Sequence, residues 1–229
     1  MASDQTRTYQ RAECVVFLKT KEAFGGLSNM AGGYGLQVNG IHIPSSEALY
    51  QACRFPHRPD IQRIIIGQSS PMTAKMKSKP HRSDSRPDWE QMRVNIMRWC
   101  IRVKLAQHRG TFGALLLDTG DRPIVEESRR DDFWGAKPVD ECTLVGMNVL
   151  GRLLMELREA VKTDEPGRII RVEPPAIADF KLDGRAVGVV TGCGAGKPIR
   201  NKPKAERART LAQAALFDEP QYNGSRHRS

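Results

Sequence analysis

The chain contains 229 residues, of which 39% are hydrophobic and 27% charged, and this is enough to bury the core of one substantial domain with an appendage. Its apolar runs fall well short of a membrane span and no basic-then-apolar leader opens the sequence, so we expect a soluble, cytoplasmic protein without a membrane partner. The net charge of +10 indicates a field that attracts polyanions, and nucleic acid is the first candidate partner.

The basic excess is spread over the whole sequence. Residues 1–162 hold 24 basic and 18 acidic side chains, and residues 163–229 hold 12 and 8. A solvated basic surface is the alternative to a nucleic-acid interface. The five cysteines are scattered without a CxxC pair, so they predict reduced thiols and no metal site.

The first part of the chain is expected to form strands that lead into a helix. Residues 14–18 (CVVFL) predict a short buried strand, and residues 24–30 form a glycine-rich loop. Apolar and polar residues alternate on both sides of Asn39-Gly40, which is the strongest local signal for a two-residue β-hairpin. Ser45 or Ser46 then caps the helix that follows.

Glu47 is the first candidate catalytic residue. It falls in the first turn of that helix, where the helix dipole favours an ionised carboxylate. The dipole alone would explain an acid at this position. An ionised carboxylate is also the group that an enzyme needs to stabilise a developing cation or to activate water.

Two short helices and a basic cluster are predicted next. Residues 60–66 favour one helix, and Pro71 after Ser70 opens another. The basic side chains between residues 75 and 86 are interrupted by a single acid, and they indicate either phosphate contacts or a solvated loop. They are Lys75, Lys77, Lys79, Arg82 and Arg86.

A long amphipathic helix is predicted to extend to about residue 108. Asp88 and Gln91 resemble a capping box at its start. Apolar residues at helical spacing give it a broad buried face. Trp89 lies at the beginning of this helix and is its best candidate for lining a pocket.

Two segments in the second half suggest a ligand pocket. After a brief strand, residues 131–135 (DDFWG) place acids beside two aromatic rings, a combination suited to binding a sugar or a base. Core aromatic residues beside a turn are the alternative. Residues 146–151 (GMNVLG) lead into an amphipathic helix, and glycines at a helix start let the backbone approach a ligand.

The sequence changes character after residue 162. Proline and glycine clusters punctuate it, and residues 197–209 hold six basic residues against one acid. We expect residues 163–229 to form a basic extension that is partly ordered or disordered and that contacts nucleic acid or a protein partner.

Together these segments resemble the NADAR (YbiA-like) family of N-glycosidases from about residue 16 to residue 161. The resemblance implies an α+β fold, with a compact, mainly helical catalytic domain over residues 1–162 that contains a small β-sheet. It also implies cleavage of N-glycosidic bonds in ribose phosphate compounds without a metal or other cofactor. The segments that carry it are residues 24–30, 44–47 (PSSE) with Tyr50-Gln51, 70–72 (SPM), 88–89 (DW), 125–126 (VE), 131–135 (DDFWG) and 146–155 (GMNVLGRLLM).

The resemblance also implies roles for individual residues. Glu47 matches the acid that the family needs for catalysis, and it is expected to stabilise the cationic sugar and to activate water. Asp131 is expected to orient the ribose hydroxyls or to assist proton transfer to the leaving base. The expected substrate-binding residues are Ser28, Asn29, Gln51, Lys75, Lys79, Arg82, Trp89, Phe133, Trp134, Gly135, Asn148 and Gly151.

One departure from the family bears on the substrate. The family commonly reads Glu-His-x-x-Gln, whereas Ala48 stands here in place of the histidine. One branch hydrolyses early riboflavin-pathway intermediates, and another removes ADP-ribose from guanine in DNA as the antitoxin to a DNA ADP-ribosyltransferase toxin. Ala48 and the +10 charge favour the second branch.

We therefore expect ADP-ribosylated single-stranded DNA as the substrate and a cognate toxin as a candidate protein partner. A glycosidase of riboflavin intermediates is the first alternative. The second is a non-catalytic binder of ADP-ribose or nucleic acid, which the presence of Glu47 and Asp131 disfavours.

Overall fold

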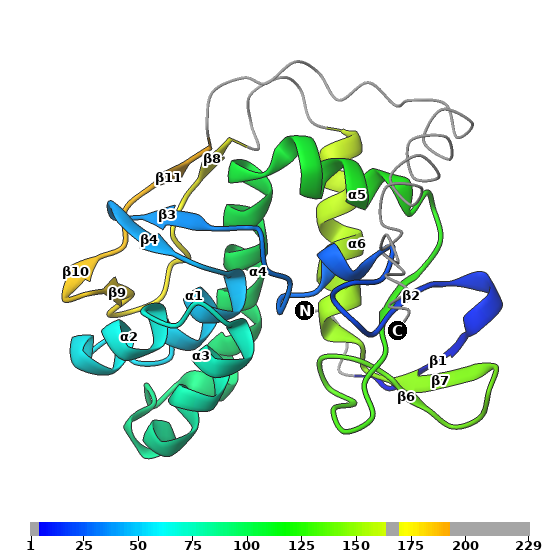
Figure 1. Ribbon diagram of the computed structural model, residues 1–229, viewed down its shortest axis with the longest axis horizontal. Coiled ribbons are helices and arrows are strands. Elements are labelled where there is room, and N and C mark those ends of the chain that lie inside the picture. Colours follow the sequence, from blue (N-terminus) through cyan, green and yellow to red (C-terminus); the bar gives the residue numbers. More distant parts are fainter. Residues whose placement is uncertain (1–4, 164–169, 193–229) are drawn as a thin grey trace, which may run out of the picture. The chain divides into compact units, whose positions relative to one another are not determined.

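The structure is a computed structural model that describes residues 5–163 and 170–192, so the basic run at 197–209 lies outside the described residues. Helices and short strands are mixed along the chain, which confirms the predicted α+β class (Figure 1). The helices are α1 (Ser46–Ala52), α2 (Pro59–Ile66), α3 (Pro71–Ser78), α4 (Trp89–Gln107), α5 (Ala114–Asp118) and α6 (Val149–Lys162). The strands are β1 (Arg7–Gln10), β2 (Val15–Phe17), β3 (Leu36–Val38), β4 (Ile41–Ile43), β5 (Ile124–Glu126), β6 (Lys137–Pro138), β7 (Thr143–Gly146), β8 (Arg171–Val172), β9 (Lys181–Leu182), β10 (Arg185–Ala186) and β11 (Val190–Thr191).

The strands form several small sheets. β1, β7 and β6 make an antiparallel sheet of three strands, while β2 pairs in parallel with β5. β3 and β4 form the predicted hairpin, and Asn39 and Gly40 both adopt the positive φ angles, 53° and 78°, that its tight turn requires. The β2–β5 pair matters most for the site, because it places Glu126 opposite Phe17 at the end of a buried strand.

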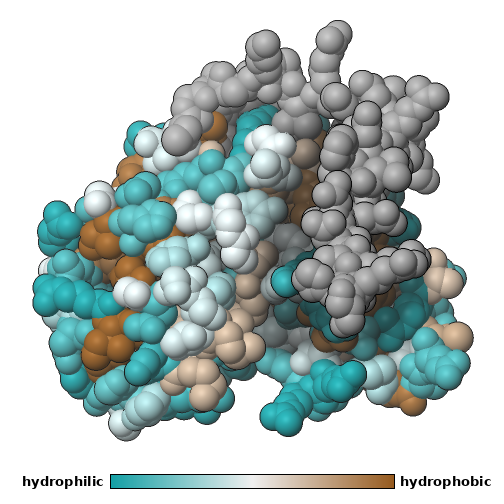
Figure 2. Space-filling model, in the orientation of Figure 1, coloured by the Kyte–Doolittle hydropathy of each residue, from teal (hydrophilic) through white to brown (hydrophobic). Residues whose placement is uncertain are grey.

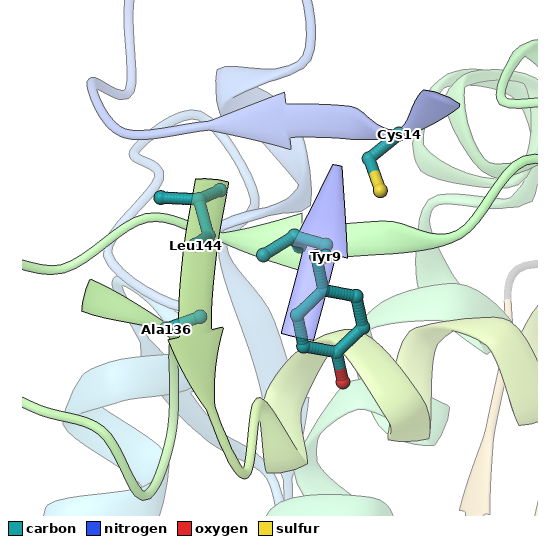
Figure 3. Close-up of a cluster of buried hydrophobic side chains, with 5 residues drawn as sticks. Tyr9, Cys14, Ala136 and Leu144 are labelled. Carbon is teal, nitrogen blue, oxygen red and sulfur yellow. The ribbon is translucent and has the colours of Figure 1, made fainter. Parts of the chain in front are cut away.

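A small apolar cluster ties the N-terminal strand to the second half of the chain. Figure 3 shows Tyr9 of β1 and Leu144 of β7 beside Cys14 and Ala136, and all four side chains are buried. Burial of each large apolar side chain stabilises the fold by roughly 1.5–3 kcal/mol. The cluster therefore holds Ala136, and with it the preceding DDFWG segment, against the sheet.

Helix α4 lies between two groups of helices. In Figure 1, α1, α2 and α3 lie on one side of α4 and α6 on the other, and both α1 and α6 contact α4. The predicted capping box at its start is wrong. The Asp88 carboxylate accepts a hydrogen bond from Arg86 Nη2 at 2.9 Å and makes none to the helix amides, because the guanidinium is a stronger partner.

Residues 170–192 pack against α2 and α4. β8 pairs with β11 beside α4, and β9 pairs with β10. The buried amide of Gln62 on α2 donates to the Lys181 carbonyl at 3.0 Å and accepts from the Asp183 amide at 2.7 Å. This part of the chain beyond residue 162 therefore has specific polar contacts with the helices.

The surface shown in Figure 2 is mostly hydrophilic, with scattered hydrophobic patches. Exposed large hydrophobic side chains include Ile64 of α2 and Met72 and Met76 of α3. Among the residues that the structure describes, no helix combines the length and the apolar character needed to cross a membrane.

Close packing of α6 on β5 depends on Gly151. A β-carbon at this position would lie 2.1 Å from the Ile124 carbonyl oxygen and 2.5 Å from the Asn148 side chain. We expect Gly151→Ala to lower the free energy of unfolding by about 2 kcal/mol or more, measured by urea denaturation. Gly110→Ala is the control, because a β-carbon there meets no atom within 4 Å. A Gly151→Ala midpoint equal to that of the wild type would contradict this account.

Candidate active site

Glu47 is held in place by two neutral amides. Ser45 caps α1 by accepting from the Ala48 amide at 3.2 Å, which confirms the predicted cap and puts Glu47 in the first turn. The Glu47 side chain is only 5% exposed. Asn29 Nδ2 donates to its Oε2 at 2.7 Å, and Gln51 Nε2 donates to its Oε1 at 2.9 Å. Among the residues that the structure describes, the carboxylate is therefore oriented by neutral donors and has no ion-pair partner that would compete with a cationic substrate.

Helix α3 fixes the orientation of Gln51. The Ser78 hydroxyl donates to Gln51 Oε1 at 2.8 Å, so the amide hydrogens of Gln51 are directed to Glu47. All three side chains are buried. Both carboxylate oxygens of Glu47 therefore have a buried donor, and these hydrogen bonds fix the direction of the carboxylate.

The loop that carries Ser28 and Asn29 is anchored from two sides. The Asn29 carbonyl accepts from the Glu47 amide at 3.2 Å, at the start of α1. From α4, Lys104 Nζ donates to the Gly26 carbonyl at 2.7 Å and to the Ser28 carbonyl at 3.1 Å. Ser28 thus contributes its backbone to the anchoring, and Asn29 contributes its side chain to Glu47.

Lys104 is a fully buried cation that the sequence analysis did not single out. Its ammonium group lies 4.2 Å from the centroid of the Tyr34 ring and 4.3 Å from that of Phe112. Burial lowers the pKa of Lys104 to about 7, while the two carbonyls and the two ring faces favour its charged form. A lysine within an apolar helix face is the signal that could have revealed it.

Glu126 brings a second glutamate to the site. It ends β5, and its amide donates to Asn148 Oδ1 at 3.1 Å. The pKa of Glu126 is raised to about 7, first by burial and then by the charges of Asp131 and Glu47, while Lys75 acts in the opposite direction. Glu47, Lys75 and Asp131 therefore all lie within electrostatic range of Glu126. In the sequence, Glu126 stands out only as part of the motif at residues 125–126, which predicts no role for it.

Asp131 shapes the turn that presents two aromatic residues. Its Oδ1 accepts from the Phe133 amide at 3.0 Å and from the Trp134 amide at 2.9 Å. A turn at these acids is the alternative that the sequence offers to direct ligand binding by residues 131–135. The charge of Asp131 also raises the pKa of Glu126. Asp131 therefore stabilises the turn and also contributes negative charge close to Glu126.

Four aromatic side chains form a continuous wall beside Glu47, which we call the aromatic wall. The ring centroids of Phe133 and Trp134 are 5.0 Å apart, those of Trp134 and Tyr50 5.7 Å, and those of Tyr50 and Trp89 5.1 Å. Burial, followed by the charge of Glu47, raises the pKa of Tyr50 well above its usual range, so its hydroxyl stays neutral. Such a wall can stack on a base or a sugar.

Gly135, Asn148 and Gly151 serve the scaffold beneath the site. Asn148 is fully buried, and its Nδ2 donates to the Ile124 carbonyl at 2.8 Å while its amide donates to the Gly135 carbonyl at 3.0 Å. A β-carbon at Gly135 would lie 2.5 Å from the Glu126 carbonyl oxygen. These residues therefore position Glu126 and the aromatic wall through contacts with the backbone of β5 and of the segment that carries Phe133 and Trp134.

The three predicted phosphate-binding residues are exposed on α3 and the following 3₁₀ helix, Lys79–Asp84. Lys75 lies close enough to influence Glu126, and Arg82 close enough to influence Arg54. Two further cations were not predicted, Arg54 and Arg93, whose guanidinium carbons lie 4.5 Å and 3.7 Å from the ring centroids of Trp89 and Phe133.

A separate cavity of about 270 Å³ lies between α4 and residues 173–177, and none of the predicted site residues lines it. Within residues 5–163 and 170–192, no group of three or more His, Cys, Asp or Glu side chains is arranged to hold a metal ion.

The similarity of this chain to known proteins covers the segment that contains the candidate active site. Residues 16–162 match the NADAR domain family. The chain is 35% identical over 152 residues to the N-glycosidase YbiA of Escherichia coli (strain K12), covering 65% of this chain and 89% of that protein. It is 31% identical over 157 residues to the riboflavin biosynthesis protein VVA0006 of Vibrio vulnificus (strain YJ016), covering 69% of this chain and 41% of that protein.

A solved structure shares the fold. The solution structure of E. coli YbiA aligns with a TM-score of 0.56 and 31% sequence identity, covering 69% of this chain and 96% of that one. The matched segment contains Glu47, Glu126 and the aromatic wall. Since the family match spans well over half of its residues, this chain belongs to the NADAR domain family.

Proposed function

We propose that this protein is an N-glycosidase that releases ADP-ribose from ADP-ribosylated guanine in single-stranded DNA, acting in the cytoplasm as antitoxin to a DNA ADP-ribosyltransferase. The observation that carries the glycosidase assignment is the Glu47 carboxylate, held by Asn29 and Gln51 beside the aromatic wall. The N-glycosidase names of the YbiA relatives support the same reaction class.

Glu47 acts on the sugar. Breaking an N-glycosidic bond leaves positive charge on the anomeric carbon and the ribose ring oxygen, and a fixed carboxylate stabilises that charge. The same carboxylate accepts a proton from the water that attacks the anomeric carbon. The two amide donors keep Glu47 oriented throughout, so little reorganisation is needed as the charge develops.

Glu126 acts on the leaving base. As the bond from carbon to nitrogen breaks, its electron pair moves to the base nitrogen, which then needs a proton. With its pKa raised to about 7 by burial, Glu126 holds a proton near neutral pH and can donate it. One carboxylate ionised and one protonated is the division of labour that general acid–base hydrolysis requires, and protons exchanged with solvent restore both groups.

DNA is favoured as the carrier of the ADP-ribose because of the charge of the protein. The whole chain carries +10, Arg54 and Arg93 lie over the aromatic wall with Arg82 in electrostatic range of Arg54, and Lys75 is in electrostatic range of Glu126. Such a field raises the local concentration of a polyanion. A glycosidase of riboflavin intermediates is the second candidate, favoured by relatives named riboflavin biosynthesis proteins.

A comparison of the two substrate classes tests this proposal. We expect kcat/KM for an ADP-ribosylated guanine oligonucleotide to exceed that for ribosylated riboflavin-pathway intermediates, and to fall as the salt concentration rises. The small substrate serves as the control for salt effects on the active site itself. A higher kcat/KM for the riboflavin intermediate would assign the protein to the second function, and binding of ADP-ribose without any turnover would leave only a binding role.

A further inference from the structure

We propose that Arg54, Arg82 and Arg93 form a phosphate-binding subsite at the aromatic wall, which holds the phosphate on the 5′-oxygen of the substrate ribose. The inference rests on the proposed function, because it takes the pocket beside Glu47 as the ribose site. Both candidate substrates offer this group. ADP-ribose carries it as part of a diphosphate, and a ribose phosphate compound carries it as a monoester.

Two of the guanidinium groups cap the ends of the aromatic wall. Arg54, which follows α1, lies over Trp89 with 4.5 Å between its guanidinium carbon and the ring centroid. Arg93 of α4 lies over Phe133 at 3.7 Å. Because Tyr50 joins these ends and is three residues from Glu47 in α1, the cations are built into the pocket that contains the catalytic candidate.

Within residues 5–163 and 170–192, Arg54 forms no ion pair with a carboxylate, unlike neighbouring arginines. Arg58 pairs with Asp60 and Asp84, and Arg86 pairs with Asp88. Among the described residues, the buried Nε of Arg54 has no hydrogen-bond partner. A buried donor without a partner costs stability, and a bound anion would supply the missing acceptor.

Arg82 and Arg93 both repel the guanidinium group of Arg54. The pKa of Arg54 is lowered first by burial and then by the charges of Arg82 and Arg93, while Tyr50 and Glu90 act in the opposite direction. Arg93 Nε lies 3.1 Å from a carboxylate oxygen of Glu90, but the Glu90 side chain is 67% exposed, so solvent screens this ion pair. An anion bound between the three cations would relieve their repulsion.

The chemistry of the cluster selects a phosphate. A guanidinium group presents N–H donors in a planar fork that matches two phosphate oxygens. Stacking on Trp89 and Phe133 restricts Arg54 and Arg93, so less conformational entropy is lost when the anion binds. The exposed Arg82 supplies a third cation at the side open to solvent.

Binding of ribose 5-phosphate, ADP-ribose and unphosphorylated ribose to the full chain tests the subsite by calorimetry. We expect Arg54→Met and Arg93→Met each to weaken ribose 5-phosphate and ADP-ribose by about tenfold or more, and to leave the affinity for ribose unchanged. Arg54→Lys keeps the positive charge and loses the planar fork of donors, so it should weaken binding of ribose 5-phosphate by an intermediate amount. This variant tests the subsite if Arg54→Met does not fold. Arg102→Met is the matched control. Arg102 is exposed on α4 and, at about half a helical turn in angle from Arg93, projects from the opposite side of the helix.

The outcomes separate this proposal from the proposed function. Equal affinities of wild type, Arg54→Met and Arg54→Lys for ribose 5-phosphate would overturn the subsite, as would an equal loss in Arg102→Met. A loss for ADP-ribose without any loss for ribose 5-phosphate would also overturn it, because the contact would then lie beyond the 5′-phosphate. If binding depends on Arg54 but modified DNA is not cleaved, the subsite stands and the proposed function fails.

Discussion

Replacing Glu47 with glutamine is expected to reduce kcat for N-glycoside hydrolysis by about 10³-fold or more, with little change in substrate affinity. The substitution keeps the size of the side chain and removes the negative charge that stabilises the cationic sugar. The measurement is single-turnover cleavage of a ribose phosphate N-glycoside, with the dissociation constant determined in parallel.

The environment of Glu47 sets the control for this experiment. Asn29 and Gln51 both donate to the carboxylate, so a glutamine amide at residue 47 would face one of them with its own donor and cost about 1–3 kcal/mol of stability. Thermal denaturation must therefore accompany the kinetics. Glu156→Gln, at an exposed glutamate of α6, should keep wild-type activity. Wild-type kcat in folded Glu47→Gln would remove Glu47 from catalysis.

Replacing Glu126 with glutamine is expected to lower kcat by about 10²–10⁴-fold and to change its pH dependence. If Glu126 is the proton donor, the active form is the protonated one, so wild-type kcat falls as the pH rises through about 7, the raised pKa of this group. Glutamine cannot donate a proton, so this descending limb is absent in the variant. The measurement is kcat between pH 5 and pH 9 for both proteins.

Glu127→Gln is the neighbouring control for Glu126. The Glu127 carboxylate pairs with Arg11 at 2.7 Å, and its variant should keep the limb near pH 7. Stability supplies a second readout with a defined sign. Because the folded-state pKa of Glu126 is raised above that of the unfolded chain, its stabilising contribution is complete at low pH and is lost as the pH rises through about 7. A flat wild-type profile between pH 6 and pH 8 would contradict the assignment.

Local interactions made several features predictable from the sequence. The hairpin at Asn39-Gly40, the cap at Ser45 and the helix start at Pro71 depend on residues within four positions of each other, and all three occur in the structure. The capping box at Asp88 failed for an equally local reason. Arg86, two residues away, takes the carboxylate that the helix amides would otherwise use.

The second carboxylate could not be predicted from its surroundings in the sequence. Glu126 lies 79 positions from Glu47, and its place in the site depends on parallel pairing of β5 with β2 and on the buried Asn148. Its raised pKa arises from burial and from the charge of Asp131 and Glu47, which are properties of the assembled fold. Family resemblance pointed to residues 125–126 but gave the acid no role.

The distinction between binding and scaffold residues also required the fold. Asn148 and Gly151 belong to a motif that resembles a ligand-binding helix start, yet their contacts are with the backbone of β5. Arg54 and Arg93 have no pattern in the sequence that links them, since the aromatic wall that joins them combines residues from α1, α4 and the segment before β6.

The most direct test of the central claim is mass spectrometry of an ADP-ribosylated guanine oligonucleotide after incubation with the protein, with Glu47→Gln in parallel. We predict that the wild type returns the unmodified oligonucleotide and releases intact ADP-ribose, while Glu47→Gln leaves the modified strand unchanged. Persistence of the modification with the wild type would contradict the account. So would loss of the whole modified base, because the bond cleaved would then be the one to deoxyribose.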